Sequence, residues 1–142
     1  MIPYNEIAAV FLIRIFLGLL FFWQGYDKIF NIKIKGVIAT FKHPLIEKHF
    51  PSFLLSLSAY YTSYIEFLGG FLLIIGLAKY IILFLLGLDL LMVAMAFGII
   101  NPMWDLQQVF VRLFLIAVLL LSPSQWDVIS MDYLLAFNKF KL

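Results

Sequence analysis

Cysteine is absent from the 142 residues, and charged side chains make up only 13% of them. Without a thiol, the chain cannot form a disulfide, exchange thiols or hold an iron–sulfur cluster through cysteine. Any redox role would therefore belong to a partner or to a bound cofactor. The formal charge is only +2, and the lysines are scattered, so we expect no nucleic-acid-binding face.

Apolar side chains are present in excess. Hydrophobic residues make up 65% of the chain, and its mean hydropathy is +1.06. A helix needs about 20 predominantly apolar residues to cross a hydrocarbon core about 30 Å thick. The length therefore allows four such spans and little else. We predict an all-α membrane protein, a four-transmembrane-helix bundle forming one domain over residues 1–142.

The four predicted helices extend over about residues 7–26, 53–77, 81–100 and 106–121. A very short turn that contains Lys79 and Tyr80 separates the second span from the third, so the two spans should be antiparallel neighbours. The first apolar run has no basic segment before it and contains Arg14. We therefore expect it to remain as a helix and not to be a cleaved signal peptide.

Two amphipathic segments flank the spans. Residues 31–52 alternate lysine and histidine with isoleucine, valine and phenylalanine, which predicts an interfacial segment after the first helix. Residues 124–142 predict an amphipathic C-terminal tail on the same grounds. His43 and His49 lie in the first of these segments, but no cysteine or carboxylate cluster completes a ligand shell, so no metal site is expected.

Each predicted span contains one ionisable residue, and a charge at that position is costly in lipid. The four residues are Arg14, Glu66, Asp89 and Arg112. A charge at mid-helix costs on the order of 3 kcal/mol, so such residues usually face the bundle interior and find partners. Counted from the N-terminal side at about 1.5 Å per residue, their depths are about 10 to 15 Å. We therefore predict one layer in which two positive and two negative charges balance.

Helical spacing predicts which faces point inward. Arg14 lies on a stripe with Gly18, Gly25 and Lys28, and Glu66 lies on a stripe of small residues. On the fourth span, a polar stripe is formed by Asp105, Gln108 and Arg112.

Three interpretations of the four charges remain open. They could be two buried ion pairs that fix helix register, without a ligand. They could form the polar floor of a pocket that binds a quinone, a lipid or another hydrophobic molecule. They could also form a proton relay through one of the carboxylates.

Three segments together resemble the DoxX family of small four-helix membrane proteins. The first, RIFLGLLFFWQGYDK, carries Arg14, Gly18, Gly25 and Lys28. The second, EFLGGFLLIIGLAKY, carries Glu66, Gly69, Gly70 and Gly76. The third, SPSQWDVISMDYLL, is similar to the closing motif of the family but lacks its glycines. Asp89 and Arg112 match no family position.

The resemblance implies a role beside membrane redox enzymes, because the family is named after a subunit of a thiosulfate:quinone oxidoreductase. We therefore expect a non-catalytic accessory subunit of a membrane complex, partnered by another membrane protein. The alternative is a quinone- or lipid-binding enzyme, or oxidoreductase subunit, that uses Glu66 and Asp89. Quinone and lipid are the candidate cofactors.

The expected location is the plasma (inner) membrane of a bacterium, with several crossings. Five lysines surround the loop after the first helix and three lie on the opposite side, which favours a cytoplasmic loop and external termini. Related folds are often drawn with both termini inside, so the orientation of the chain in the membrane stays open.

Overall fold

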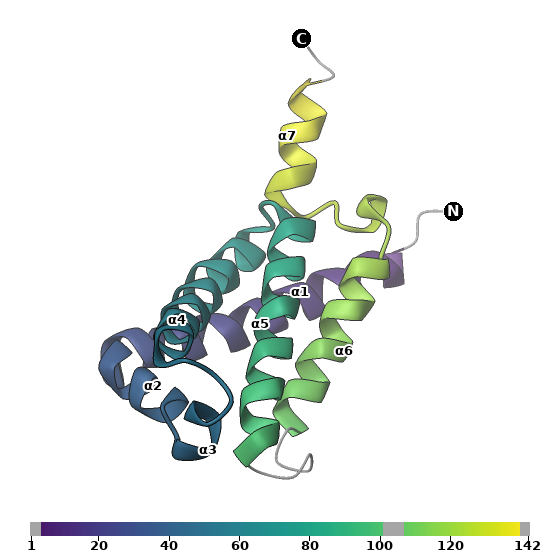
Figure 1. Cartoon of the computed structure of the whole chain (residues 1–142). Coiled ribbons are helices and arrows are strands. Elements are labelled where there is room, and N and C mark those ends of the chain that lie inside the picture. Colours follow the sequence, from purple (N-terminus) through teal and green to yellow (C-terminus); the bar gives the residue numbers. More distant parts are fainter. Residues whose placement is uncertain (1–3, 101–106, 140–142) are drawn as a thin grey trace.

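The computed structural model describes residues 4–100 and 107–139, which form helices and short turns with no strand among them (Figure 1). The long helices are α1 (Tyr4–Tyr26), α4 (Ser52–Ile75), α5 (Lys79–Ile100) and α6 (Gln107–Leu121). The other elements are η1 (Asp27–Asn31, π-helical), α2 (Lys33–Phe41), α3 (Pro44–Glu47), η3 (Ser124–Trp126, a 3-10 turn) and α7 (Met131–Lys139). The all-α prediction is confirmed.

Most predicted helix boundaries lie close to the observed ones. Helix α1 begins at Tyr4, three residues before the predicted start, and α4 stops at Ile75, two residues before the predicted end, because Gly76 adopts φ 72°, a left-handed conformation that glycine tolerates best. At the end of α1, the helix continues past Tyr26 as the π-helical segment η1. This extension brings Lys28 into the helical part of the chain.

Within the described ranges, three helices are long and apolar enough to cross a membrane: α1 with η1 (Tyr4–Asn31), α4 and α5. Large apolar side chains on these helices face outward, including Leu12, Phe53 and Ile81 at 64% to 74% exposure. Such surfaces are stable when lipid covers them. The apolar part of α6, Val109–Leu121, is shorter than the other three, and its role as a fourth span stays a prediction.

The α1–α4 pair forms the closest helix crossing. A Cβ atom at Gly25 would lie 2.2 Å from the backbone nitrogen of Phe67, and one at Gly70 would lie 2.3 Å from the backbone nitrogen of Phe22. The two backbones therefore touch where these glycines face each other, as small residues permit in membrane helices. Helix α5 then packs on α4 through Gly69, Ile82 and Leu86.

The core has two parts. The larger one lies among α1, α4, α5 and α6, with Leu17, Phe21, Leu73, Leu86 and Leu119 fully buried. The smaller one is formed where α2 and α3 pack near the start of α4 and the end of α5, around the buried residues Val37, Phe41, Ile46, Leu55, Ala59 and Ala96. The segment predicted to be interfacial thus folds as two short helices against the bundle, and its placement at a membrane surface stays a prediction.

The C-terminal tail forms η3 and α7. Figure 1 shows α7 extending beyond the adjoining ends of α4 and α5, away from the other helices. The main-chain N–H of Asp132 donates to the carbonyl oxygen of Gly76 at 3.0 Å, which joins the start of α7 to the α4–α5 turn.

Candidate functional site

Three elements bring together a group of side chains that we call the carboxylate site: Lys28 from η1, Thr62 and Glu66 from α4, and Asp89 from α5. The Lys28 Nζ atom lies 2.7 Å from Glu66 Oε2 and donates a hydrogen bond to Thr62 Oγ1 at 3.0 Å. Glu66 and Asp89 are buried, at 1% and 0% exposure. A cation and two carboxylates are thus held together in the interior.

Asp89 is the least satisfied member of the carboxylate site. Thr62 and Glu66 lie close enough to interact with its side chain, and Lys28 is an electrostatic neighbour, yet neither carboxylate oxygen has a partner of good hydrogen-bond geometry among the described residues. A buried acceptor without a donor loses its hydration without compensation, which costs about 1 to 3 kcal/mol or more for a charged group. Asp89 therefore has acceptor capacity left for a donor from outside the described chain.

Arg112 approaches this site from α6. Its guanidinium donates to Gln24 Oε1 on α1, lies 5.6 Å from the centroid of the Phe21 ring, and interacts electrostatically with Glu66 and Asp89. Of the polar stripe predicted on this helix, Asp105 lies outside the described residues, and nothing is described of the Gln108 side chain.

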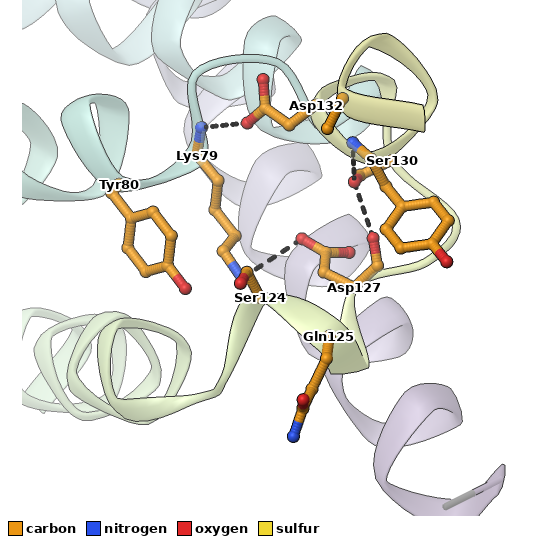
Figure 2. Close-up of a pocket in the computed structure, with 9 residues that line it drawn as sticks. Lys79, Tyr80, Ser124, Gln125, Asp127, Ser130 and Asp132 are labelled. Carbon is orange, nitrogen blue, oxygen red and sulfur yellow. Dashed lines mark hydrogen bonds and ion pairs between the residues drawn. The ribbon is translucent and has the colours of Figure 1, made fainter. Parts of the chain in front are cut away.

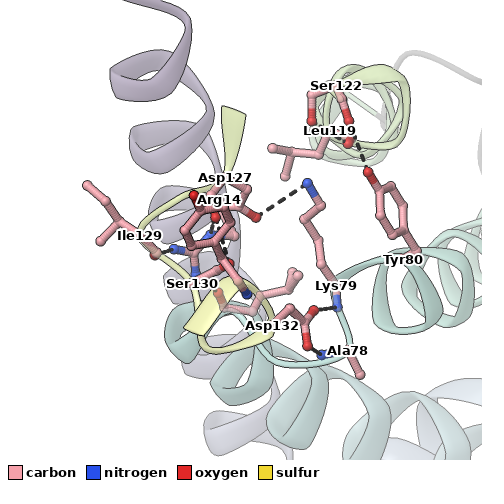
Figure 3. A network of polar contacts seen from close by, with 12 residues as sticks. Arg14, Ala78, Lys79, Tyr80, Leu119, Ser122, Asp127, Ile129, Ser130 and Asp132 are labelled. Atoms are coloured by element: carbon pink, nitrogen blue, oxygen red, sulfur yellow. Dashed lines mark hydrogen bonds and ion pairs between the residues drawn. The ribbon is translucent and has the colours of Figure 1, made fainter. Parts of the chain in front are cut away.

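Arg14 belongs to a different group, which we call the helix-end network: Arg14, Lys79, Asp127, Ser130 and Asp132 (Figure 3). The Arg14 Nε atom donates to Asp127 Oδ1 at 3.1 Å. Its terminal nitrogens donate to the carbonyl oxygens of Leu73 and Ile74, at 2.6 and 2.9 Å, and to that of Ile129 at 2.5 Å. One guanidinium thus ties α1 to the end of α4 and to the segment before α7.

Lys79 and Asp132 complete the network at the start of α5. The Lys79 Nζ atom lies 3.3 Å from Asp127 Oδ2. The two carboxylate oxygens of Asp132 accept from the main-chain N–H groups of Ala78 and Lys79, each at 2.9 Å. Asp132 therefore caps α5 from a distant part of the chain, satisfying donors that the first turn of a helix leaves free.

A cavity of about 330 Å³ opens beside this network (Figure 2). Lys79 and Tyr80 line it from α5, Ser124 from η3, and Asp132 and Tyr133 from α7. The cavity lies at the start of α5 and just after α6, whereas the carboxylate site lies further along α5, at Asp89.

The structure divides the predicted layer of four charges into two groups. It brings Glu66, Asp89 and Arg112 into one electrostatic neighbourhood, but Arg14 turns to carbonyls near the end of α4. Leu73 is seven residues, or about 10 Å along the helix, from Glu66. The expected balance of four charges in one layer is therefore wrong for Arg14, because its long side chain reaches partners nearer the helix end.

Sequence reasoning assigned other roles to three residues of these groups. The sequence places Lys28 on the first-helix stripe, in the family motif and among the loop lysines, but gives it no carboxylate partner, because the predicted span ends at Tyr26. Lys79 was assigned to a turn and Asp127 to an interfacial tail. The stripe shared with Arg14 was the available signal for Lys28. For Asp127 there was no local signal, since its partner Arg14 lies 113 residues away in the sequence.

Among the described residues, no group of three or more His, Cys, Asp or Glu could hold a metal ion. His43 Nδ1 instead accepts from the main-chain N–H of Leu45 at 3.3 Å and caps α3.

We expect Asp132→Ala to lower the free energy of unfolding by about 1 to 2 kcal/mol, because α5 loses both capping acceptors. Amide hydrogen exchange at Ala78 and Lys79 should accelerate, which mass spectrometry of the purified protein can measure. Asp132→Asn keeps one acceptor oxygen, so its free energy of unfolding should lie between those of Asp132→Ala and the unaltered protein. Unchanged exchange at both amides in Asp132→Ala would contradict the capping role.

The fold and its buried polar groups define a small all-helical membrane protein. Residues 9–101, more than half of the chain, match the family model described as DoxX. The chain belongs to the DoxX family. No curated protein and no solved structure matches it. The matched range contains Arg14, Lys28, Glu66 and Asp89, whereas Arg112 and Asp127 lie beyond it.

Proposed function

We propose that this chain is a non-catalytic accessory subunit of a redox complex in a bacterial plasma membrane, which it crosses four times with α6 as the fourth span. Its carboxylate site holds the polar head of a hydrophobic ligand that donates hydrogen bonds, either a quinol or a hydroxylated lipid. Family membership supports the membrane and redox setting. The absence of cysteine supports an accessory role, because any electron-transfer centre then comes from a partner or cofactor.

The unsatisfied carboxylate of Asp89 carries the ligand proposal. Both of its oxygens accept hydrogen bonds and donate none when ionised, so a matching ligand must supply O–H or N–H groups. A quinol has two hydroxyl groups, whereas an oxidised quinone has only acceptor oxygens and can engage Lys28 alone. The carboxylate site should therefore bind the reduced form more tightly than the oxidised form.

The competing interpretation is an enzyme subunit in which Glu66 and Asp89 act chemically on a bound quinone or lipid. The close approach of Lys28, Glu66 and Asp89 supports it, because the three together could pass a proton to or from a ligand. Steady-state turnover of a quinol by the purified complex separates the two. An accessory role predicts that Glu66→Gln weakens ligand binding more than it changes the turnover of ligand already bound.

The direct test measures binding of a short-chain quinol to the protein in mild detergent. We expect Asp89→Asn to weaken binding about tenfold, which corresponds to loss of about 1.4 kcal/mol of hydrogen bonding to a charged acceptor. Glu6→Gln is a matched control, because Glu6 is an exposed carboxylate at the start of α1. Its quinol affinity should equal that of the unaltered protein.

If Asp89→Asn and Glu66→Gln both keep quinol and lipid binding but lower the unfolding temperature, the carboxylates only fix helix register. The accessory role has its own test, which is the size and composition of the complex in native gels of solubilised membranes. A stoichiometric association with an oxidoreductase subunit is expected, and migration of the chain alone would contradict it.

A further inference from the structure

The cavity at the helix-end network and a second, apolar groove follow one seam between α5 and α6. The groove has a volume of about 180 Å³ and only apolar side chains line it, among them Phe84, Leu91, Leu113 and Leu120. Figure 1 shows α5 and α6 running side by side along their lengths. The polar cavity lies at the end of this seam and the groove lies further along it.

The spacing of their lining residues places the two next to each other along the chain. Tyr80 lines the polar cavity, and Phe84, one turn later on the same face of α5, lines the groove. From the other side, Leu120 lines the groove, and Ser124, four residues later, lines the cavity. Within about 6 Å of helix length, the seam thus changes from ionic to wholly apolar.

The polar end has a buried ammonium with spare donor capacity. The Lys79 side chain is only 3% exposed, and its ammonium lies 3.3 Å from Asp127 Oδ2 and 4.8 Å from the Tyr80 ring centroid. Apart from this ion pair with Asp127, the ammonium has no hydrogen-bond partner among the described residues, so N–H groups remain for a further acceptor. Figure 2 shows this side chain reaching past Tyr80 towards Asp127 at the wall of the cavity. An acceptor oxygen brought by a ligand would satisfy it.

The charges around the cavity favour a ligand that carries both signs. Arg14 and Lys79 are balanced by Asp127 and Asp132, so an added anion alone would leave net negative charge. Each Asp132 oxygen accepts one backbone N–H and keeps a further acceptor position for an ammonium group. A phosphate near Lys79 and an ammonium near Asp132 preserve neutrality.

We propose that the cavity and the groove together form a binding site for a zwitterionic phospholipid with a primary ammonium in its head group, such as phosphatidylethanolamine. The head group occupies the cavity, and one acyl chain lies in the groove between α5 and α6. Exposed Ile81 and Leu121 flank the junction and add apolar surface for the chains. This site is separate from the carboxylate site and does not depend on the function proposed for it.

Gly87 allows a clean test, because it lines the groove and a Cβ atom there would meet only Ile116 Cγ2, at 3.9 Å. Gly87→Leu therefore fills the groove without forcing the helices apart. Gly98→Leu is the matched control: a Cβ atom there meets nothing within 4 Å, and Gly98 does not line the groove.

The experiment is native mass spectrometry of the detergent-solubilised protein with added phosphatidylethanolamine, phosphatidylcholine, phosphatidylglycerol or diacylglycerol. We expect one phosphatidylethanolamine retained per chain, with about tenfold weaker retention of the other three. Gly87→Leu should reduce retention of phosphatidylethanolamine about tenfold, and Gly98→Leu should leave it unchanged. Lys79→Gln should abolish the preference for phosphatidylethanolamine over diacylglycerol.

Equal retention of all four lipids would overturn the proposal, because it indicates unselective annular lipid. Unchanged phosphatidylethanolamine binding in Gly87→Leu would also overturn it. Asp89→Asn should retain phosphatidylethanolamine as the unaltered protein does, so a failure of this proposal is distinguishable from a failure of the quinol proposal.

Discussion

Replacing Arg14 by methionine should destabilise the protein by about 3 to 5 kcal/mol, the cost of removing one partner from a buried charge pair. Methionine fills much of the same volume but donates no hydrogen bond. Among the described residues, the carbonyl oxygen of Ile129 loses the Arg14 donor, that of Leu73 keeps only the Gly76 N–H, and the Asp127 side chain keeps only Lys79. The measurement is the unfolding midpoint in a defined detergent, together with protease sensitivity of the segment after α6.

Two further variants separate the charge of Arg14 from its geometry. Arg14→Lys retains a cation near Asp127 but cannot reach several carbonyls at once, so its stability should lie between those of Arg14→Met and the unaltered protein. Lys79→Met leaves the Arg14–Asp127 pair intact and should cost less than Arg14→Met. An Arg14→Met protein with an unchanged unfolding midpoint would show that the network contributes nothing to stability.

Replacing Gly25 by alanine should separate α1 from α4. The added methyl would lie 2.2 Å from the backbone nitrogen of Phe67 and 2.6 Å from its Cα atom, so no side-chain rotation can relieve the overlap. We expect a loss of about 3 kcal/mol, at the upper end of the usual cost of overpacking, because a whole helix must move. Lys28 lies on the extension of α1, so its 2.7 Å contact with Glu66 should lengthen as well.

Gly98→Ala is the control for this variant. Its added methyl meets nothing within 4 Å, and alanine favours a helix over glycine by roughly 0.5 to 1 kcal/mol, so the control should be slightly stabilised. The quinol binding assay gives a second readout, in which Gly25→Ala should bind more weakly than Gly98→Ala. Equal unfolding midpoints of the two alanine variants would contradict a tight α1–α4 crossing.

The two polar groups differ in how completely their atoms are satisfied. The Arg14 guanidinium has four partners at the helix end and serves to hold segments together. Asp89, in contrast, is fully buried, and neither of its oxygens has a partner of good hydrogen-bond geometry among the described residues. An unsatisfied buried group is more readily explained by a ligand than by stability, because on its own it raises the energy of the fold. The search for function should therefore concentrate on Asp89 and its neighbours.

The sequence alone determined the helices and their inward faces. In lipid, the backbone N–H and C=O groups of a long apolar segment must form hydrogen bonds within the protein, so composition predicts helices directly. The 4-3 spacing then placed Arg14, Gly18 and Gly25 on one face of α1, and all three are buried. The same spacing placed Glu66 and Gly69 on one face of α4, and both are buried. The family followed from local motifs, because they preserve these same spacings.

Only the tertiary structure decided which charges meet. Depth along a helix locates a Cα atom to within a turn, but an arginine side chain reaches farther than that, and Arg14 uses its length to contact residues near Ile129. Its partner Asp127 comes from a segment that follows the last long helix, and no periodicity links the two positions. Lys28 met Glu66 because the glycine crossing brings α1 against α4. The sequence therefore indicated which residues turn inward, and the packing of the helices selected their partners.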